Sequence, residues 1–339
     1  MLLARENRWR VSGVFAVFLL LVFFSFPVHA QRDMLSSEVT AQGGSGDIFE
    51  REITPPQEYE RAIEWYMKAA EAGHVHAQAT LGHMYLTGKG VKQSDAEALR
   101  WFGTAAEQGY AYAEYMLGLM YLSGRGVPAD PVKGADYLKK AAEKDNAAAR
   151  FELARLYEEG RGVRQDAEKA AQWYLLAAEK GFAPAQAKLG DCYLDGIGIG
   201  RDAVAALKWY TSAAQHGLAV AQWRLGMMYY EGNGVPKDYE VAAEWNGRAA
   251  AQGFAPGQFA LARQVLRGQG VPKDVEKALA LARMAAEKNY EAAQYALGRA
   301  YDEGRYVKAD REQALYWYRL AAEHGSAEAL GKLKRLEGH

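Results

Sequence analysis

Residues 149–184 read ARFELARLYEEGRGVRQDAEKAAQWYLLAAEKGFAP, and the chain repeats this pattern every 36 residues. Self-similarity at a fixed period is typical of a repeat array, in which each unit buries its apolar face against its neighbours. The sequence therefore predicts seven full units over residues 77–328. The residue that opens each unit stays in register along the chain, at Ala77, Ala113, Ala149, Ala185, Ala221, Gly257, Ala293 and Ala329.

The first half of each unit predicts a short helix. Ala149, Leu153 and Tyr157 are spaced by four residues, so they share one helix face. The helix is expected to end at Gly160, the first glycine of a Gly-x-Gly-Val turn, because glycine tolerates the positive φ of such a turn. In the seventh unit Tyr306 replaces the second glycine, and this substitution puts the conformation of that turn in doubt.

The second half predicts another helix, which runs through a Trp-Tyr pair such as Trp173 and Tyr174 to a glycine. Because the pair recurs in step, we expect it to be buried in the core. Asp145 and Asn289 replace the final glycine in two units, and short polar residues tolerate a left-handed helix end. One position precedes every second helix and is expected to cap it, namely Ser94, Asp130, Asp166, Asp202, Asp238, Asp274 and Asp310.

The combined pattern of Ala-x-x-x-Leu-Gly-x-x-Tyr, Gly-x-Gly-Val, Asp, Lys-Ala-x-x-Trp-Tyr and Ala-Ala-Glu-x-Gly resembles the Sel1-like repeat family, a branch of the tetratricopeptide superfamily. The resemblance covers residues 58–336. It implies an all-α fold, a right-handed α/α superhelical solenoid whose concave groove binds other proteins. It implies no reaction, and we expect a binding protein and not an enzyme.

The segments outside the repeats predict export and capping. Residues 1–30 contain an arginine-rich start, an apolar run and a small-residue cleavage site, the layout of a signal peptide. The alternative is an uncleaved inner-membrane anchor. Either reading places the repeats outside the cytoplasm, in the periplasm or secreted. Residues 31–57 are expected to be a flexible linker, residues 58–76 an N-terminal capping helix and residues 329–339 a C-terminal one.

Composition excludes some functions. Removing residues 1–30 leaves 38 basic and 41 acidic residues, a balance that does not indicate a nucleic-acid partner. Cys192 is the only cysteine, so no intrachain disulfide can form, and its helical position favours a buried small hydrophobe. His74, His76 and His83 lie close in sequence, but no set of Asp or Cys residues completes a metal site beside them. We predict no metal and no cofactor.

Partner binding is expected where the units differ, because packing does not dictate those positions. On the first helix they are the third, seventh and eleventh residues, which form one stripe. We predict that this stripe binds an envelope or secreted protein; the alternative is that its rings fill gaps between units. The candidate residues are Tyr115, Leu119, Phe151, Arg155, Trp223, Met227, Phe259, Arg263, Tyr295 and Arg299.

Two other functions remain open on the sequence. Aromatic stripes also suit a cell-wall glycan binder, since rings stack on sugar faces. A β-lactamase-like or other envelope hydrolase is less favoured, because the chain has no Ser-x-x-Lys, no His-Glu-x-x-His and no Gly-x-Ser-x-Gly motif. The sixth unit is degenerate, with Val265 for the tyrosine and Leu281-Ala282 for the Trp-Tyr pair, and is expected to be a weak link.

Overall fold

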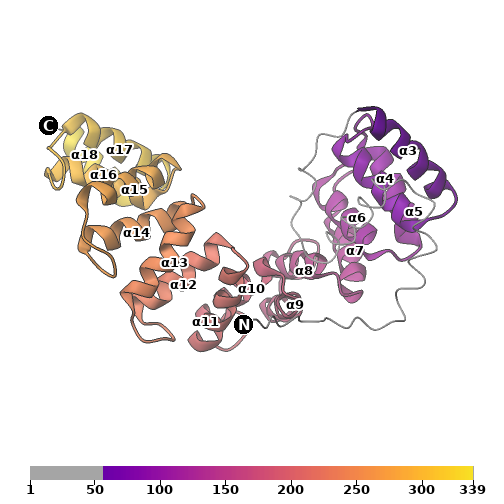
Figure 1. Cartoon of the computed structure of the whole chain (residues 1–339), viewed down its shortest axis with the longest axis horizontal. Coiled ribbons are helices and arrows are strands. Elements are labelled where there is room, and N and C mark those ends of the chain that lie inside the picture. The colour runs from indigo at the N-terminus through magenta and orange to yellow at the C-terminus, as the bar shows by residue number, and fades with distance from the viewer. Residues whose placement is uncertain (1–55, 339) are drawn as a thin grey trace, which may run out of the picture. The chain divides into compact units, whose positions relative to one another are not determined.

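The computed structural model describes residues 56–338, which form sixteen α-helices and no strand (Figure 1). The predicted signal peptide and all but the end of the predicted linker lie outside the described residues. The chain divides after Asn146 into two compact lobes, the N-terminal and the C-terminal lobe. The N-terminal lobe contains α3 (Pro56–Glu71), α4 (Val75–Thr87), α5 (Asp95–Glu107), α6 (Ala111–Ser123) and α7 (Pro131–Glu143).

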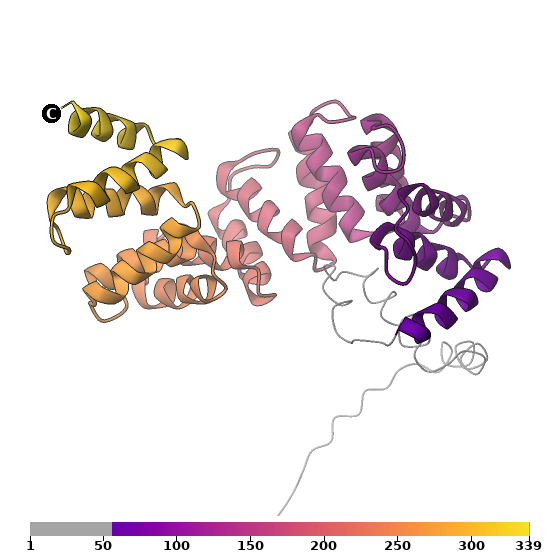
Figure 2. The ribbon, with the colours of Figure 1, turned by 90° about the horizontal axis from the view of Figure 1, so that it is seen from above.

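The C-terminal lobe consists of five helix hairpins, α8 to α17, followed by the single helix α18. Figure 2 shows these helices from a second direction. The helices of this lobe are α8 (Ala147–Glu159), α9 (Ala167–Glu179), α10 (Ala183–Asp195), α11 (Ala203–Gln215), α12 (Ala219–Glu231), α13 (Tyr239–Ala251), α14 (Ala255–Arg267), α15 (Val275–Glu287), α16 (Glu291–Glu303), α17 (Arg311–Glu323) and α18 (Ala327–Glu337). The all-α repeat solenoid predicted from the sequence is confirmed.

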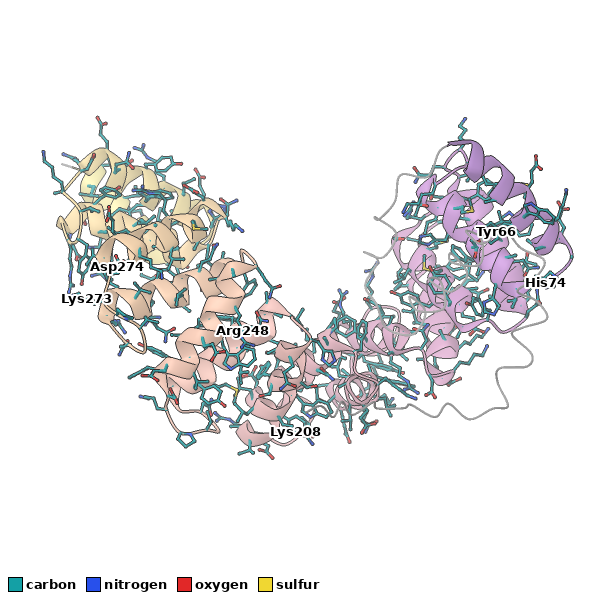
Figure 3. The ribbon with its side chains drawn as sticks, in the orientation of Figure 1. Tyr66, His74, Lys208, Arg248, Lys273 and Asp274 are labelled. Carbon is teal, nitrogen blue, oxygen red and sulfur yellow. The ribbon has the colours of Figure 1, made fainter. Side chains whose placement is uncertain are left out.

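One residue closes each hairpin from both sides. The Asp166 carboxylate accepts the amide of Lys169 at 3.0 Å, and its own amide donates to the Tyr157 carbonyl at 2.9 Å. The hydrogen bond from the Lys169 backbone N–H holds the pKa of Asp166 below its usual range. All seven predicted caps make both bonds, Asp274 of Figure 3 among them. The predicted N-caps are therefore confirmed.

The turn glycines adopt the predicted left-handed backbone. Gly232 and Gly234 have φ of 76° and 73°, and Asp145 and Asn289 have φ of 65° and 62°. The second glycine also meets a steric limit, because a Cβ on Gly234 would stand 2.5 Å from the Ala203 carbonyl oxygen of the preceding hairpin. The glycine thus lets the turn lie directly against the start of the neighbouring helix.

The seventh turn keeps this conformation without its glycine. Tyr306 has φ of 70°, and its exposed ring lies beside the Arg305 guanidinium at 5.2 Å. A left-handed backbone costs an L-residue roughly 1–2 kcal/mol. The doubt raised by the sequence is resolved in favour of a strained turn of the same shape.

The two helices of a hairpin pack closely around a small residue on the first helix. The ring of Tyr210 lies so near α10 that a Cβ on Gly190 would be 2.7 Å from Tyr210 Cε1. Tyr318 covers Gly298 in the same way, again closer than a Cβ permits. Glycine occupies this position in five hairpins and admits a side chain of the second helix, at Gly82, Gly118, Gly190, Gly226 and Gly298.

The Trp-Tyr pair is not uniformly buried. Tyr174 is 1% exposed, whereas Trp173 is only half-buried at the edge of the same cluster. The expected burial of Trp173 is therefore wrong in degree, because the side chain that faces the first helix is the second of the pair. Trp101 and Trp317 are buried as expected.

Neighbouring hairpins of the C-terminal lobe share one core. A single cluster joins Ala187 of α10, Tyr210 of α11 and Leu225 of α12, with Trp245 of α13 packed against it. Burial is therefore continuous from hairpin to hairpin, as a solenoid requires.

A buried polar ladder, which the sequence analysis missed, links the helix ends. Gln222 donates to the Ala214 carbonyl at 3.2 Å and accepts from Gln252 at 2.8 Å, so it joins α11, α12 and α13. Gln252 also donates to the Gly217 carbonyl at 2.8 Å. Buried amides stabilise a structure when both ends are paired. Gln78 and Gln294 make the same kind of link.

The ladder is interrupted in the sixth unit. Gln258 is 0% exposed, and its amide oxygen and nitrogen have no hydrogen-bond partner within residues 56–338. A buried unpaired amide costs about 1–3 kcal/mol. The unit also sets Ala282 against Ala262, where other hairpins bury a larger side chain. These features add to the reasons for expecting a weak link there.

We expect Gly190→Ala to destabilise the chain by about 1–3 kcal/mol, because its methyl group collides with Tyr210. Thermal and urea unfolding followed by circular dichroism measure the change. Gly247→Ala is the matched control: this helical glycine has nothing within 4 Å of an added Cβ. It should stabilise by up to about 1 kcal/mol through helix propensity. Equal effects of both variants would contradict the packing described above.

Candidate functional site

The predicted stripe follows the first helix of successive hairpins. Tyr115 and Leu119 lie on α6 in the N-terminal lobe. In the C-terminal lobe the candidates lie on α8, α12, α14 and α16, and α10 contributes Ala187 and Asp191 at the equivalent positions. Each lobe thus presents its part of the stripe on its own first helices.

The aromatic residues of the stripe are half-buried and take part in packing. Phe151 lies 5.6 Å from the Tyr174 ring and 5.4 Å from Phe182, the residue just before the next first helix. Trp223 meets Phe254 at 6.0 Å in the same way. Such ring pairs contribute about 0.5–1.5 kcal/mol beyond area burial. The rings therefore fill gaps between hairpins and expose only part of their surface, as do Tyr115, Phe259 and Tyr295.

The seventh positions are more accessible and chemically diverse. Leu119, Met227 and Arg155 are half-buried, and Arg263 and Arg299 are exposed. Arg155 pairs with Glu152 and Glu159, each at 3.2 Å, while Arg299 pairs with Glu303 at 3.0 Å. Burial raises the pKa of Glu152 despite the Arg155 charge.

Beside the stripe, buried tyrosines connect neighbouring hairpins through carboxylates. Tyr210 donates to Asp191 at 2.6 Å, and Arg224 of the next hairpin lies 3.2 Å from the same carboxylate. Burial, and then the hydrogen bond to Asp191, raises the pKa of Tyr210 well above its ordinary value. Tyr174–Glu158–Lys188 and Tyr318–Asp302–Arg335 form the same arrangement.

These connections are structural and were missed from the sequence. A signal for two of them exists: Glu158 and Asp302 replace an apolar residue near the end of a first helix, and a lysine follows 30 residues later at Lys188 and Lys332. An acidic residue at a position that normally carries a packed apolar side chain indicates a basic partner in the next repeat.

His76, His83 and Cys192 take part in ordinary packing and hydrogen bonding. His83 shares a hydrogen bond of 3.2 Å with the Tyr112 hydroxyl, and burial lowers the His83 pKa. His76 packs edge-on against Tyr110 at 4.9 Å. Among the residues described, no group of three or more His, Cys, Asp or Glu side chains could hold a metal ion. Cys192 is half-buried, a correction to its predicted full burial, and burial raises its pKa to about 11.

We expect Phe151→Ala to lower the stability by about 2 kcal/mol, because the ring packs on Tyr174 and Phe182. Arg155→Gln should change it by less than about 0.5 kcal/mol, since its ion pairs are half-exposed. Urea unfolding of both variants tests the difference. A ring that contributes no stability would instead be free for a ligand.

We expect Cys192 to react with iodoacetamide about a hundredfold more slowly in the folded chain than in urea at pH 8. A thiol whose pKa is near 11 holds about a hundredth of the thiolate of one near 9. The alkylation rate of the folded chain should therefore keep rising about tenfold per pH unit up to about pH 11, whereas the rate in urea should level off above about pH 9. A folded rate equal to the unfolded one would refute the packing assigned to this thiol.

Within residues 56–338, none of the helices combines the length and the apolar character that a membrane span requires.

The Sel1 repeat family model matches eight segments, 46–74, 75–110, 111–146, 147–182, 183–218, 219–254, 255–290 and 291–326. Seven of them coincide, within two residues at each boundary, with the seven predicted units. The match at 46–74 lies partly outside the described residues.

Solved structures give the same result. A Sel1 repeat protein from Oxalobacter formigenes is 29% identical, with a TM-score of 0.65, and the alignment covers 99% of this chain and 97% of that one. The c5321 protein, a protective antigen of uropathogenic Escherichia coli with an SLR fold, is 35% identical with a TM-score of 0.64 over 81% of this chain and 67% of that chain. No curated protein sequence gave a significant match. The matching segments cover most of the chain, which belongs to the Sel1 repeat family.

Proposed function

We propose that this chain is an exported scaffold of the bacterial cell envelope that binds a segment of another protein along its first-helix stripe. The observation that carries the proposal is the division of labour within the repeat. Core positions such as Leu189 and Leu225 recur and are buried, whereas the seventh positions differ from unit to unit and remain accessible.

Family membership supports the binding role. Sel1 repeat proteins generally bind other proteins and are generally not catalytic. The seventh-position side chains Leu119, Met227 and Arg263 supply apolar and cationic contacts of the kinds that anchor protein interfaces. A partner segment lying across successive first helices of the C-terminal lobe would meet a different side chain at each hairpin, so the order of those side chains would set its specificity.

Residues 1–30 support the proposed location through their signal-peptide layout. The description of the similar Escherichia coli protein as a protective antigen also favours a position outside the cytoplasm. Release into the periplasm or beyond is the favoured form of export, with membrane anchoring by an uncleaved N-terminal segment as the alternative.

The ring geometry disfavours the glycan-binding alternative. Phe151 and Trp223 each pack on a neighbouring aromatic ring, so part of the surface that would stack on a sugar is already covered. We therefore assign the stripe to a protein segment.

A photo-crosslinking amino acid placed at Met227 in cells tests the scaffold function. We expect a discrete protein adduct from Met227 on the stripe and none from Lys208, an exposed residue on the second helix α11 (Figure 3). Fractionation of the same cells should place the adduct in the envelope. Equal labelling from both positions, or no adduct from Met227, would refute the assigned face.

A further inference from the structure

We propose that α14 carries a subsite for an acidic peptide segment, in which Arg263 and Arg267 bind carboxylate side chains of the partner. This inference rests on the proposed scaffold function and specifies the chemistry of the partner. It concerns one helix face, formed by Phe259, Arg263 and Arg267 at intervals of four residues.

The face of α14 differs from its equivalents in charge. On α8 and α16 the arginine at the seventh position is followed one turn later by a glutamate, and the pairs Arg155–Glu159 and Arg299–Glu303 close at 3.2 and 3.0 Å. On α14 the residue one turn later is Arg267. The eleventh positions of the seven first helices are Thr87, Ser123, Glu159, Asp195, Glu231, Arg267 and Glu303.

Both arginines of α14 are exposed, and neither has an acidic partner in the part of the chain that the structure describes. Within residues 56–338 no carboxylate lies at ion-pair distance from Arg263 or Arg267. Like charges one turn apart on a helix destabilise it slightly. A bound anion would relieve that repulsion, and this favours a ligand that brings negative charge.

One of the two guanidinium groups is held in place. Arg267 donates to the Tyr230 hydroxyl at 2.9 Å, and that hydroxyl donates to Gln269 at 2.9 Å. The bond uses one nitrogen of the guanidinium group and leaves others to donate to a ligand. A pre-positioned guanidinium loses less conformational entropy on binding a carboxylate.

The spacing of the face fits a peptide better than a small anion. The two arginines are separated by one turn, about 5–6 Å between Cβ atoms, so they can engage separate carboxylates. Phe259 lies a further turn away and is half-buried against Tyr290 at 5.7 Å. An extended segment that presents two acidic residues and one apolar residue would match the three positions together.

Fluorescence anisotropy with a labelled peptide of about ten residues, carrying three glutamates and one phenylalanine, tests the subsite on the full chain. Because a hydrogen bond to a charged group is stronger than a neutral one, we expect Arg263→Gln and Arg267→Gln each to weaken binding by about 3–10-fold and the double variant by about 30-fold. Arg248→Gln is the matched control. This exposed arginine lies on the second helix α13, away from the stripe, and pairs with Glu244, so binding should change less than about twofold.

A second peptide, with glutamine in place of every glutamate, should bind at least about tenfold more weakly to the wild-type chain. Equal binding of both peptides, or an equal loss in the Arg248→Gln control, would overturn the subsite. Displacement of the acidic peptide by equimolar inorganic phosphate would also overturn it, because a simple anion site would then suffice. Unfolding curves of the arginine variants should match the wild type, since exposed substitutions change stability little.

Crosslinking from Met227 in the double-arginine variant separates this inference from the scaffold proposal. Loss of the wild-type adduct supports the acidic subsite. An adduct that persists unchanged leaves the scaffold function standing and refutes the subsite. Absence of an adduct even in the wild type removes the scaffold function on which the subsite rests.

Discussion

Close approach of the two helices in each hairpin is the constraint on which the structure depends. Gly190 and Gly298 admit the rings of Tyr210 and Tyr318 to positions that a single methyl group would occupy. This contact fixes the spacing of the hairpin, and the shared cores then fix the spacing between hairpins. Positions committed to this packing recur, and the remaining positions are free to differ.

The local signals of the sequence predicted most of this fold. Caps and turn glycines depend on chemistry within a few residues, so Asp166 at a helix start and Gly232 at a helix end could be assigned directly. Tyr306 shows the limit of such reasoning. It adopts the left-handed conformation of the glycines in the other turns although its residue type disfavours that backbone.

Features that depend on contacts between units could not be predicted in the same way. Periodicity placed Trp173 and Tyr174 together in the core. Which ring is buried depends on which side of the second helix packs against the first helix. Asn246 donates a hydrogen bond of 2.8 Å to Gln264, and both buried residues stand at positions where the repeat pattern favours an apolar or aromatic side chain. The stripe was located by its variability, whereas the packing of its rings on residues such as Phe182 required the structure.

The sixth unit combines weak packing with unusual charge. Gln258 is buried without a partner, Ala262 and Ala282 meet where a larger side chain packs elsewhere, and Arg263 stands one turn from Arg267. Each feature opposes stability, so none is explained by the needs of the fold. Local rules are broken most often where a protein binds something else, because a ligand compensates for what the free chain lacks. The coincidence of these three departures on α14 and its partner helix is therefore a physical reason to look for the ligand at this unit.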